Sequence, residues 1–108
     1  MARETTQEAF ATAWADGGLV IDVREEDEYA AGHVPGARLM PLRSVPAQCG
    51  ELPNDRPVYV ICASGNRSKT AADWMNSRDI DAYSMPGGTG AWVRAGHPIA
   101  AGRHEHAA

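Results

Sequence analysis

The sequence has few cysteines, and this limits the chemistry that thiols can perform in it. It contains two, Cys49 and Cys62, which do not form a Cys-x-x-Cys pair, and no histidine lies at zinc-ligand spacing from both. A disulfide between them is one interpretation. We expect instead two free thiols in a reducing cytoplasm, and neither a metal nor an organic cofactor is implied.

Long apolar runs and an excess of positive charge are also missing. No stretch approaches the roughly 20 apolar residues of a membrane span. Residues 1–10 include Arg3, Glu4 and Glu8 and have no apolar centre, unlike a secretory signal peptide. The formal net charge of -4 argues against a broad nucleic-acid surface. We therefore expect a cytoplasmic protein without nucleic-acid or membrane partners.

The composition is that of a folded protein. The 108 residues are 44% hydrophobic and 22% charged, which suits one compact domain with a modest core. We predict a single domain over residues 1–108. Residues 100–108 are small and polar and are expected to fray.

Predicted helices and strands alternate along the chain. A first helix is expected to begin at a Thr5–Glu8 capping box and to end at Gly17-Gly18. The other expected helices cover residues 25–31, 42–49, 67–78 and 89–95. Strands are expected at residues 19–21, 37–40, 58–61, 82–84 and 98–99. This alternation predicts an α/β fold with a mainly parallel sheet and helices on both faces.

The segment that follows the strongest strand carries the chemistry. Cys62 follows residues 58–61, where ligands bind at the carboxyl ends of parallel strands. Gly65 and Asn66 tolerate positive φ, so the backbone N–H groups after Cys62 can turn inward. The loop then enters a helix N-terminus, and Arg67 adds a cation. These features predict a lowered Cys62 pKa and an accessible thiolate. The alternative is an inert core cysteine, for which Gly65 and Arg67 would be odd neighbours.

Three motifs together resemble the rhodanese-like superfamily. They are Asp22-Val23-Arg24 with its continuation to Ala37, the loop 62–68, and Pro86-Gly87-Gly88 with Trp92. The resemblance implies a three-layer α/β/α fold with a five-stranded parallel sheet. It also implies a single-domain sulfurtransferase of the thiosulfate sulfurtransferase type, in which Cys62 takes a sulfane sulfur from a donor such as thiosulfate and passes it to cyanide or a thiol.

The resemblance assigns the loop to substrate binding. The expected binding residues are Ala63, Ser64, Gly65, Asn66, Arg67 and Ser68. Four residues separate Cys62 from Arg67, as in the sulfurtransferases, whereas the related phosphatases have five. The loop lacks the Arg- and Lys-bearing pattern of thiosulfate-specialised enzymes, and Asp79 replaces a frequent glycine after the helix.

Other polar residues have two interpretations each. Asp22 and Arg24 form either a catalytic pair or, as we predict, a brace between loops. His33 is either a general base or, as we predict, a tie for the turn at residues 32–36.

Apolar and terminal residues also have more than one interpretation. Trp92 and Met85 are candidates to line the pocket, while Trp14 and Trp74 are expected in the core. Cys49 is expected to be a bystander, and residues 104–106 a tail rather than a metal site.

Two further functions remain as alternatives. The first is a sulfur-carrier or redox-regulatory module that uses the same Cys62 on a protein partner, with little turnover of small molecules. The second is a phosphatase or arsenate reductase, which the short loop disfavours.

Overall fold

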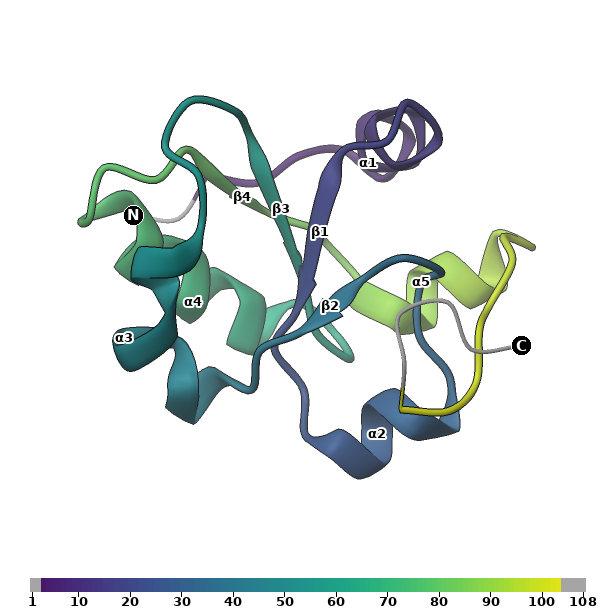
Figure 1. Cartoon of the computed structure of the whole chain (residues 1–108). Coiled ribbons are helices and arrows are strands. Elements are labelled where there is room, and N and C mark those ends of the chain that lie inside the picture. Colours follow the sequence, from purple (N-terminus) through teal and green to yellow (C-terminus); the bar gives the residue numbers. More distant parts are fainter. Residues whose placement is uncertain (1–2, 104–108) are drawn as a thin grey trace.

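The fold is built on one parallel sheet. A computed structural model describes residues 3–103. Its four strands are β1 (Leu19–Asp22), β2 (Arg38–Leu39), β3 (Val58–Ile61) and β4 (Ala82–Ser84), in the order β2-β1-β3-β4 (Figure 1). Every neighbouring pair is parallel, with Val20 opposite Tyr59 and Tyr59 opposite Tyr83. All strands therefore end at the same edge of the sheet.

Helices connect the strands and lie on both sides of the sheet (Figure 1). The α-helices are α1 (Gln7–Ala15), α2 (Glu26–Ala31), α3 (Val45–Gln48), α4 (Asn66–Asn76) and α5 (Gly88–Arg94). Two short 3₁₀ turns, η1 (Leu42–Ser44) and η2 (Cys49–Glu51), flank α3. The predicted helix over 42–49 is thus a series of three short turns, with Pro46 in the first turn of α3.

The core has two parts, one on each face of the sheet. One apolar cluster joins Ile21 and Val60 to Met75 of α4. The other joins Val20 and Ile61 to helices α1, α2 and α5. Successive strand residues enter opposite clusters, because side chains alternate across a strand. This arrangement confirms the predicted three-layer α/β/α fold.

The sheet has four strands where the sequence predicts five. Residues 98–99 form no strand, although Ala100 pairs with His33 in an isolated antiparallel bridge, with both N···O distances 2.8 Å. At β4, the last strand on one side of the sheet, Ser84 N donates to Arg3 O at 2.8 Å and Ser84 O accepts from Thr5 N at 3.0 Å. The N-terminal segment thus covers the edge of β4 that a fifth strand would otherwise pair with.

Residues 100–103 contact the rest of the domain. Beyond the bridge at Ala100, Gly102 N donates to Ala30 O at 2.8 Å, and Arg103 forms an ion pair with Glu26. The fraying expected for residues 100–108 stays a prediction. The candidate metal-binding residues 104–106 lie outside the described residues. No helix within residues 3–103 is both long and apolar enough to cross a bilayer.

Three local predictions need correction or receive support. The first helix is capped by Thr6, whose hydroxyl accepts from Ala9 N at 3.0 Å, so the Thr5–Glu8 capping box was wrong. Trp74 is 38% exposed rather than in the core, and Arg78 covers its ring. Asp79 has φ +64°, the left-handed conformation in which glycine is common.

Candidate active site around Cys62

Cys62 lies at the edge of the sheet where all strands end. It directly follows β3, and the chain turns at Gly65 into the first residue of α4. Gly65 has φ +112°, and a Cβ at this position would lie 3.3 Å from Gly87 N. A side chain would therefore be strained both by the backbone conformation and by its neighbour. Glycine at this position lets the loop close over the sulfur.

The sulfur of Cys62 is surrounded by hydrogen-bond donors. Gly65 N donates to Sγ over 3.1 Å, and Ser68 Oγ lies 3.5 Å from Sγ. A protonated Cys62 donates to Ser68, whereas a thiolate accepts from it. The helix N-terminus adds its free N–H groups on the same side. The loop thus forms the ring of donors that the sequence predicts.

These donors change the ionisation of Cys62. Burial is the largest single effect and raises the pKa of the thiol. Hydrogen bonds from the Ser68 hydroxyl and from the amides of Ser68, Gly65 and Ser64 act in the opposite direction and outweigh it. The net pKa lies below the ordinary thiol value, which favours the nucleophilic thiolate.

The Cys62 sulfur is less accessible than the sequence predicts. Cys62 is only 1% exposed, so the prediction of an open thiolate was wrong. Ser64 and Asn66 on either side of Gly65 are exposed. The reactive sulfur therefore lies beneath its own loop, and a donor molecule reaches it only if it is small or if the loop moves.

Arg67 does not hydrogen-bond the sulfur. Its guanidinium makes two hydrogen bonds to the Glu28 carboxylate, Nη1 to Oε1 at 2.7 Å and Nη2 to Oε2 at 2.9 Å. The Arg67 hydrogen bonds are the main reason that the pKa of Glu28 falls to about 2. Arg67 is nevertheless near enough for the charge on Cys62 to raise its own pKa, although Glu28 has the larger effect. Glu28, the third residue of α2, belongs to the first of the three sequence motifs, but the sequence alone assigned it no role at the site.

Asp22 and Arg24 form a buried ion pair beside the loop. The guanidinium bonds both carboxylate oxygens, with Nη2 2.9 Å from Oδ2, and Nη2 also donates to Gly32 O at 2.7 Å. Their side chains are 0% and 7% exposed. The pair therefore connects the end of β1 to the turn after α2, which is the geometry expected of a brace.

His33 is buried within the same turn. Its Nδ1 lies 2.8 Å from Tyr29 O, and its ring stacks on that of Tyr29 with centroids 3.7 Å apart. Its backbone is fixed by the bridge to Ala100. These contacts enclose the ring within the turn, and the role of His33 in holding that turn stays a prediction.

The first turn of α5 holds the loop through hydrogen bonds to its backbone. Thr89 N and Oγ1 donate to Cys62 O at 2.8 Å and 3.1 Å, and Gly90 N donates to Ala63 O at 3.2 Å. At Gly88, φ is +57° and a Cβ would lie 2.3 Å from Cys62 O. Only a residue without a side chain allows this approach. The Pro86-Gly87-Gly88 motif thus positions Cys62, and Trp92 and Met85 belong to the core rather than to a pocket.

Ser84 completes a chain of hydroxyl groups behind the sulfur. Its Oγ lies 2.7 Å from Ser68 Oγ, which in turn contacts both Cys62 Sγ and Gly65 O. Both serines are fully buried. Sequence reasoning missed Ser84, although a serine at the end of a short buried strand is an unusual polar residue and could have drawn attention.

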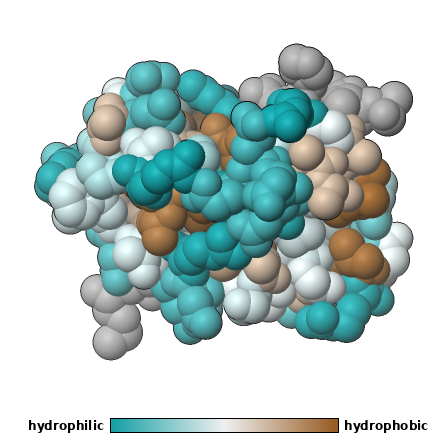
Figure 2. Space-filling view, turned by 90° about the horizontal axis from the view of Figure 1, so that it is seen from below, coloured by the Kyte–Doolittle hydropathy of each residue, from teal (hydrophilic) through white to brown (hydrophobic). Residues whose placement is uncertain are grey.

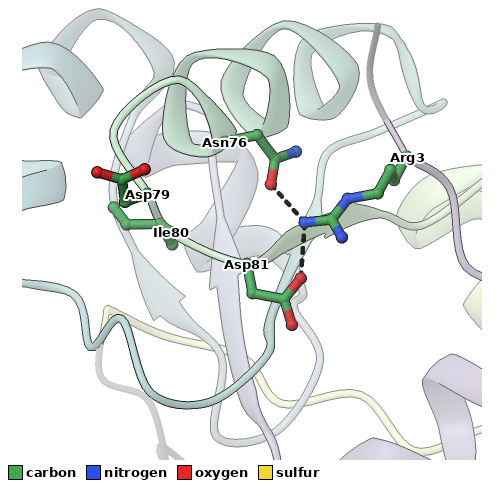
Figure 3. Close-up of a pocket in the computed structure, with 5 residues that line it drawn as sticks. All are labelled: Arg3, Asn76, Asp79, Ile80 and Asp81. Carbon is green, nitrogen blue, oxygen red and sulfur yellow. Dashed lines mark hydrogen bonds and ion pairs between the residues drawn. The ribbon is translucent and has the colours of Figure 1, made fainter.

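One pocket lies at the other end of the strands from Cys62. Figure 3 shows a pocket of about 330 Å³ at the start of β4, where Arg3 bonds Asn76 and Asp81 at 2.6 Å each. Because the strands are parallel, this pocket lies where the strands begin and Cys62 lies where they end. The view from below, onto the edge where the strands end, is mainly hydrophilic with separate apolar patches (Figure 2).

Comparison with known proteins agrees with this geometry. The family model described as a rhodanese-like domain matches residues 5–95. The chain belongs to the rhodanese-like domain family. The three sequence motifs all lie inside the matched region, and the structure brings Gly87 and Gly88 close to the loop at 62–68.

Individual relatives share this rhodanese-like fold over most of the chain. A curated protein of Allochromatium vinosum named "Sulfurtransferase" is 34% identical over 104 residues, covering 94% of this chain and 97% of the relative. A rhodanese-related protein of Thermoplasma volcanium superposes with a TM-score of 0.84 at 26% identity, covering 90% of this chain and 96% of that one. Thiosulfate sulfurtransferase from Pseudomonas aeruginosa gives a TM-score of 0.86 at 21% identity, which shows the shared fold. The match covers 97% of this chain but only 21% of the Pseudomonas aeruginosa protein.

Proposed function

We propose that this rhodanese-like protein is a sulfurtransferase that carries sulfane sulfur on Cys62. In this proposal the Cys62 thiolate attacks a donor, such as thiosulfate or a hydropersulfide, and becomes a persulfide. A thiophilic acceptor, cyanide or a thiol, then removes the outer sulfur and regenerates the thiolate. The curated relative named as a sulfurtransferase supports the reaction class.

The observation that carries the proposal is the ring of donors around Sγ. The amides that contact Sγ, together with the Ser68 hydroxyl, stabilise negative charge at the position of the sulfur. A persulfide is also an anion, in which Sγ is the inner sulfur and the outer sulfur carries the charge. The attack itself requires no general base, because a thiolate is already the nucleophile. The enclosed His33 is consistent with that chemistry.

Mass spectrometry of the intact protein tests the proposal. Incubation with thiosulfate or with a hydropersulfide is expected to add the mass of one sulfur atom, and cyanide is expected to remove it. Cys62→Ser should abolish the addition, whereas Cys49→Ser should retain it, because no donor ring surrounds Cys49. A wild-type protein that gains no sulfur from any donor would contradict the proposal.

The burial of Cys62 favours a second candidate, the carrier or redox-regulatory module. A sulfur that is 1% exposed becomes accessible when its loop moves, and a protein partner that docks on the loop would supply that movement. Steady-state turnover separates the two functions. Repeated transfer from donor to cyanide supports the enzyme, while sulfur loading without turnover supports the carrier.

Phosphatase chemistry is less well supported. Arg67 is held by two hydrogen bonds to Glu28 rather than directed at the sulfur, so it is not placed to bind a phosphoryl group on Cys62. Hydrolysis of an aryl phosphate that depends on Cys62 would revive this alternative. The cytoplasmic location expected from the sequence stays a prediction.

A further inference from the structure

The charges around Cys62 neutralise one another. Four side chains form what we call the site charge cluster: Asp22, Arg24, Glu28 and Arg67. Charge interactions connect Glu28 with both arginines, and Arg67 with both Cys62 and Asp22. Two arginines and two carboxylates sum to zero, so ionised Cys62 leaves the group at -1. Neither arginine of the cluster is left without a carboxylate.

The rest of the loop adds no compensating charge. The residues between Cys62 and Arg67 are Ala63, Ser64, Gly65 and Asn66, all of them neutral. The anion-stabilising groups at the sulfur are therefore N–H and O–H dipoles. Such dipoles stabilise negative charge but carry no net positive charge, so they offset a second negative charge less well than a cation would.

This balance discriminates between two classes of sulfur donor. Thiosulfate arrives as a dianion and leaves as the sulfite dianion. A low-molecular-weight hydropersulfide arrives as a monoanion, and its leaving group is a thiolate of charge -1. Beside an ionised Cys62, the dianion meets the greater repulsion, because Coulomb energy scales with the product of the charges.

From the pairing of Arg67 with Glu28 we infer that the preferred donor is a small hydropersulfide rather than thiosulfate, and that Glu28 sets this preference. The inference rests on the proposed function and specifies its substrate class. Glu28 acts as a specificity-determining residue, since it holds the one loop cation that could otherwise face a dianion. Its carboxylate is only 33% exposed, which limits the solvent screening of the pair.

The transfer step balances without a further reagent. The Cys62 thiolate attacks the outer sulfur of R–S–S⁻, a bond forms between the two sulfurs, and the S–S bond of the donor breaks. The electron pair of that bond leaves with R–S⁻. Cys62 then carries –S–S⁻, and the total charge of -2 is the same on both sides. With thiosulfate the same step carries a total charge of -3.

The variant Glu28→Gln tests the role of the carboxylate. Glutamine keeps an oxygen that accepts the hydrogen bond from Glu25 N, which is 3.0 Å long in the helix cap. It removes the negative charge and releases Arg67. The matched control is Glu26→Gln, which removes one charge from the same turn of α2 and releases Arg103 instead.

The measured quantity is the second-order rate constant of single-turnover sulfur loading, followed by intact mass at neutral pH. It is determined for thiosulfate and for glutathione hydropersulfide, and their ratio is compared between variants. The intrinsic reactivity of each donor and any loss of folded protein cancel in this comparison. Ser64→Lys, which adds a cation at an exposed loop position, provides an independent second variant.

We expect the wild-type protein to load faster from the hydropersulfide. Glu28→Gln should raise the thiosulfate-to-hydropersulfide ratio about tenfold, as should Ser64→Lys, while Glu26→Gln should leave it within about twofold of wild type. A ratio unchanged in Glu28→Gln and Ser64→Lys, or faster wild-type loading from thiosulfate, overturns the inference and leaves the proposed function intact. Failure of every donor to load Cys62 overturns both.

Discussion

Ser84 Oγ lies 2.7 Å from Ser68 Oγ, so one of these two hydroxyls donates to the other. Each hydroxyl has one proton to donate. Both serines are fully buried, and an unpaired buried donor is costly. If Ser84 donates to Ser68, the Ser68 proton is free for Cys62 Sγ or Gly65 O. The second hydroxyl therefore strengthens the first as a donor to the thiolate.

Removing either hydroxyl is predicted to weaken the nucleophile. Ser68→Ala should slow alkylation of Cys62 at neutral pH by about tenfold and Ser84→Ala by about threefold, because each raises the pKa of the thiol. The check is the pH dependence of the alkylation rate, whose midpoint should move upward in both variants. The exposed Ser77→Ala is the control and should match wild type. An unchanged midpoint in Ser84→Ala would show that its hydroxyl is only structural.

Gly88 is predicted to be the glycine least tolerant of a side chain. Gly88→Ala places a Cβ 2.3 Å from Cys62 O and keeps a positive φ, so it should cost more than about 3 kcal/mol of unfolding free energy. Gly96 also has a positive φ, +82°, but nothing lies within 4 Å of its Cβ position. Gly96→Ala should therefore cost about 1–2 kcal/mol. Urea unfolding measures both, and equal losses would contradict the proposed close contact.

The buried brace is predicted to matter far more than exposed ion pairs. Asp22→Ala leaves Arg24 buried with no carboxylate, at a cost of about 3–5 kcal/mol. The comparison is Glu51→Gln at the exposed Arg38–Glu51 pair, where we expect less than about 1 kcal/mol. Thermal or urea unfolding gives both values. A stable Asp22→Ala variant that still loads sulfur would show that the Asp22–Arg24 pair does not stabilise the site.

The Arg67–Glu28 pair is predicted to give a specific acid dependence of stability. The pKa of Glu28 is lowered to about 2, mainly by the Arg67 hydrogen bonds. Its contribution is therefore complete above the unfolded value of 4.5 and is lost as the pH falls toward 2.

Because both partners are about one-third exposed, that contribution should be modest, about 0.5–1 kcal/mol. Urea unfolding of wild type and of Glu28→Gln between neutral and acidic pH tests this. The difference in stability between the two proteins should shrink as the pH decreases below 4.5. A constant difference at all pH values would argue against a native-state ion pair.

Local sequence patterns predicted the strands and the loop well. Four of the expected strands are present, since short apolar runs such as Val58–Ile61 specify buried strands directly. Residues 98–99 failed as a strand, because whether a short segment joins a sheet depends on which edge is open. The N-terminal segment, not this one, pairs along β4.

The interior of the site was harder to predict than its loop. The backbone donors at Cys62 follow from glycine placement and a helix start, both of which are local. The pairing of Arg67 with Glu28 and of Ser68 with Ser84 joins residues 39 and 16 positions apart, so it depends on tertiary packing. The Cys62 carbonyl likewise accepts two hydrogen bonds from Thr89, which lies 27 positions further along the chain.

Titration of the Cys62 thiol tests the central claim most directly. The difference in thiolate ultraviolet absorbance between wild type and Cys62→Ser, recorded against pH, isolates this one sulfur. The donor ring predicts a midpoint below the ordinary thiol pKa of 9.0. A midpoint at or above that value would show that burial outweighs the amides and the Ser68 hydroxyl, and would contradict the account of Cys62 as an activated sulfur carrier.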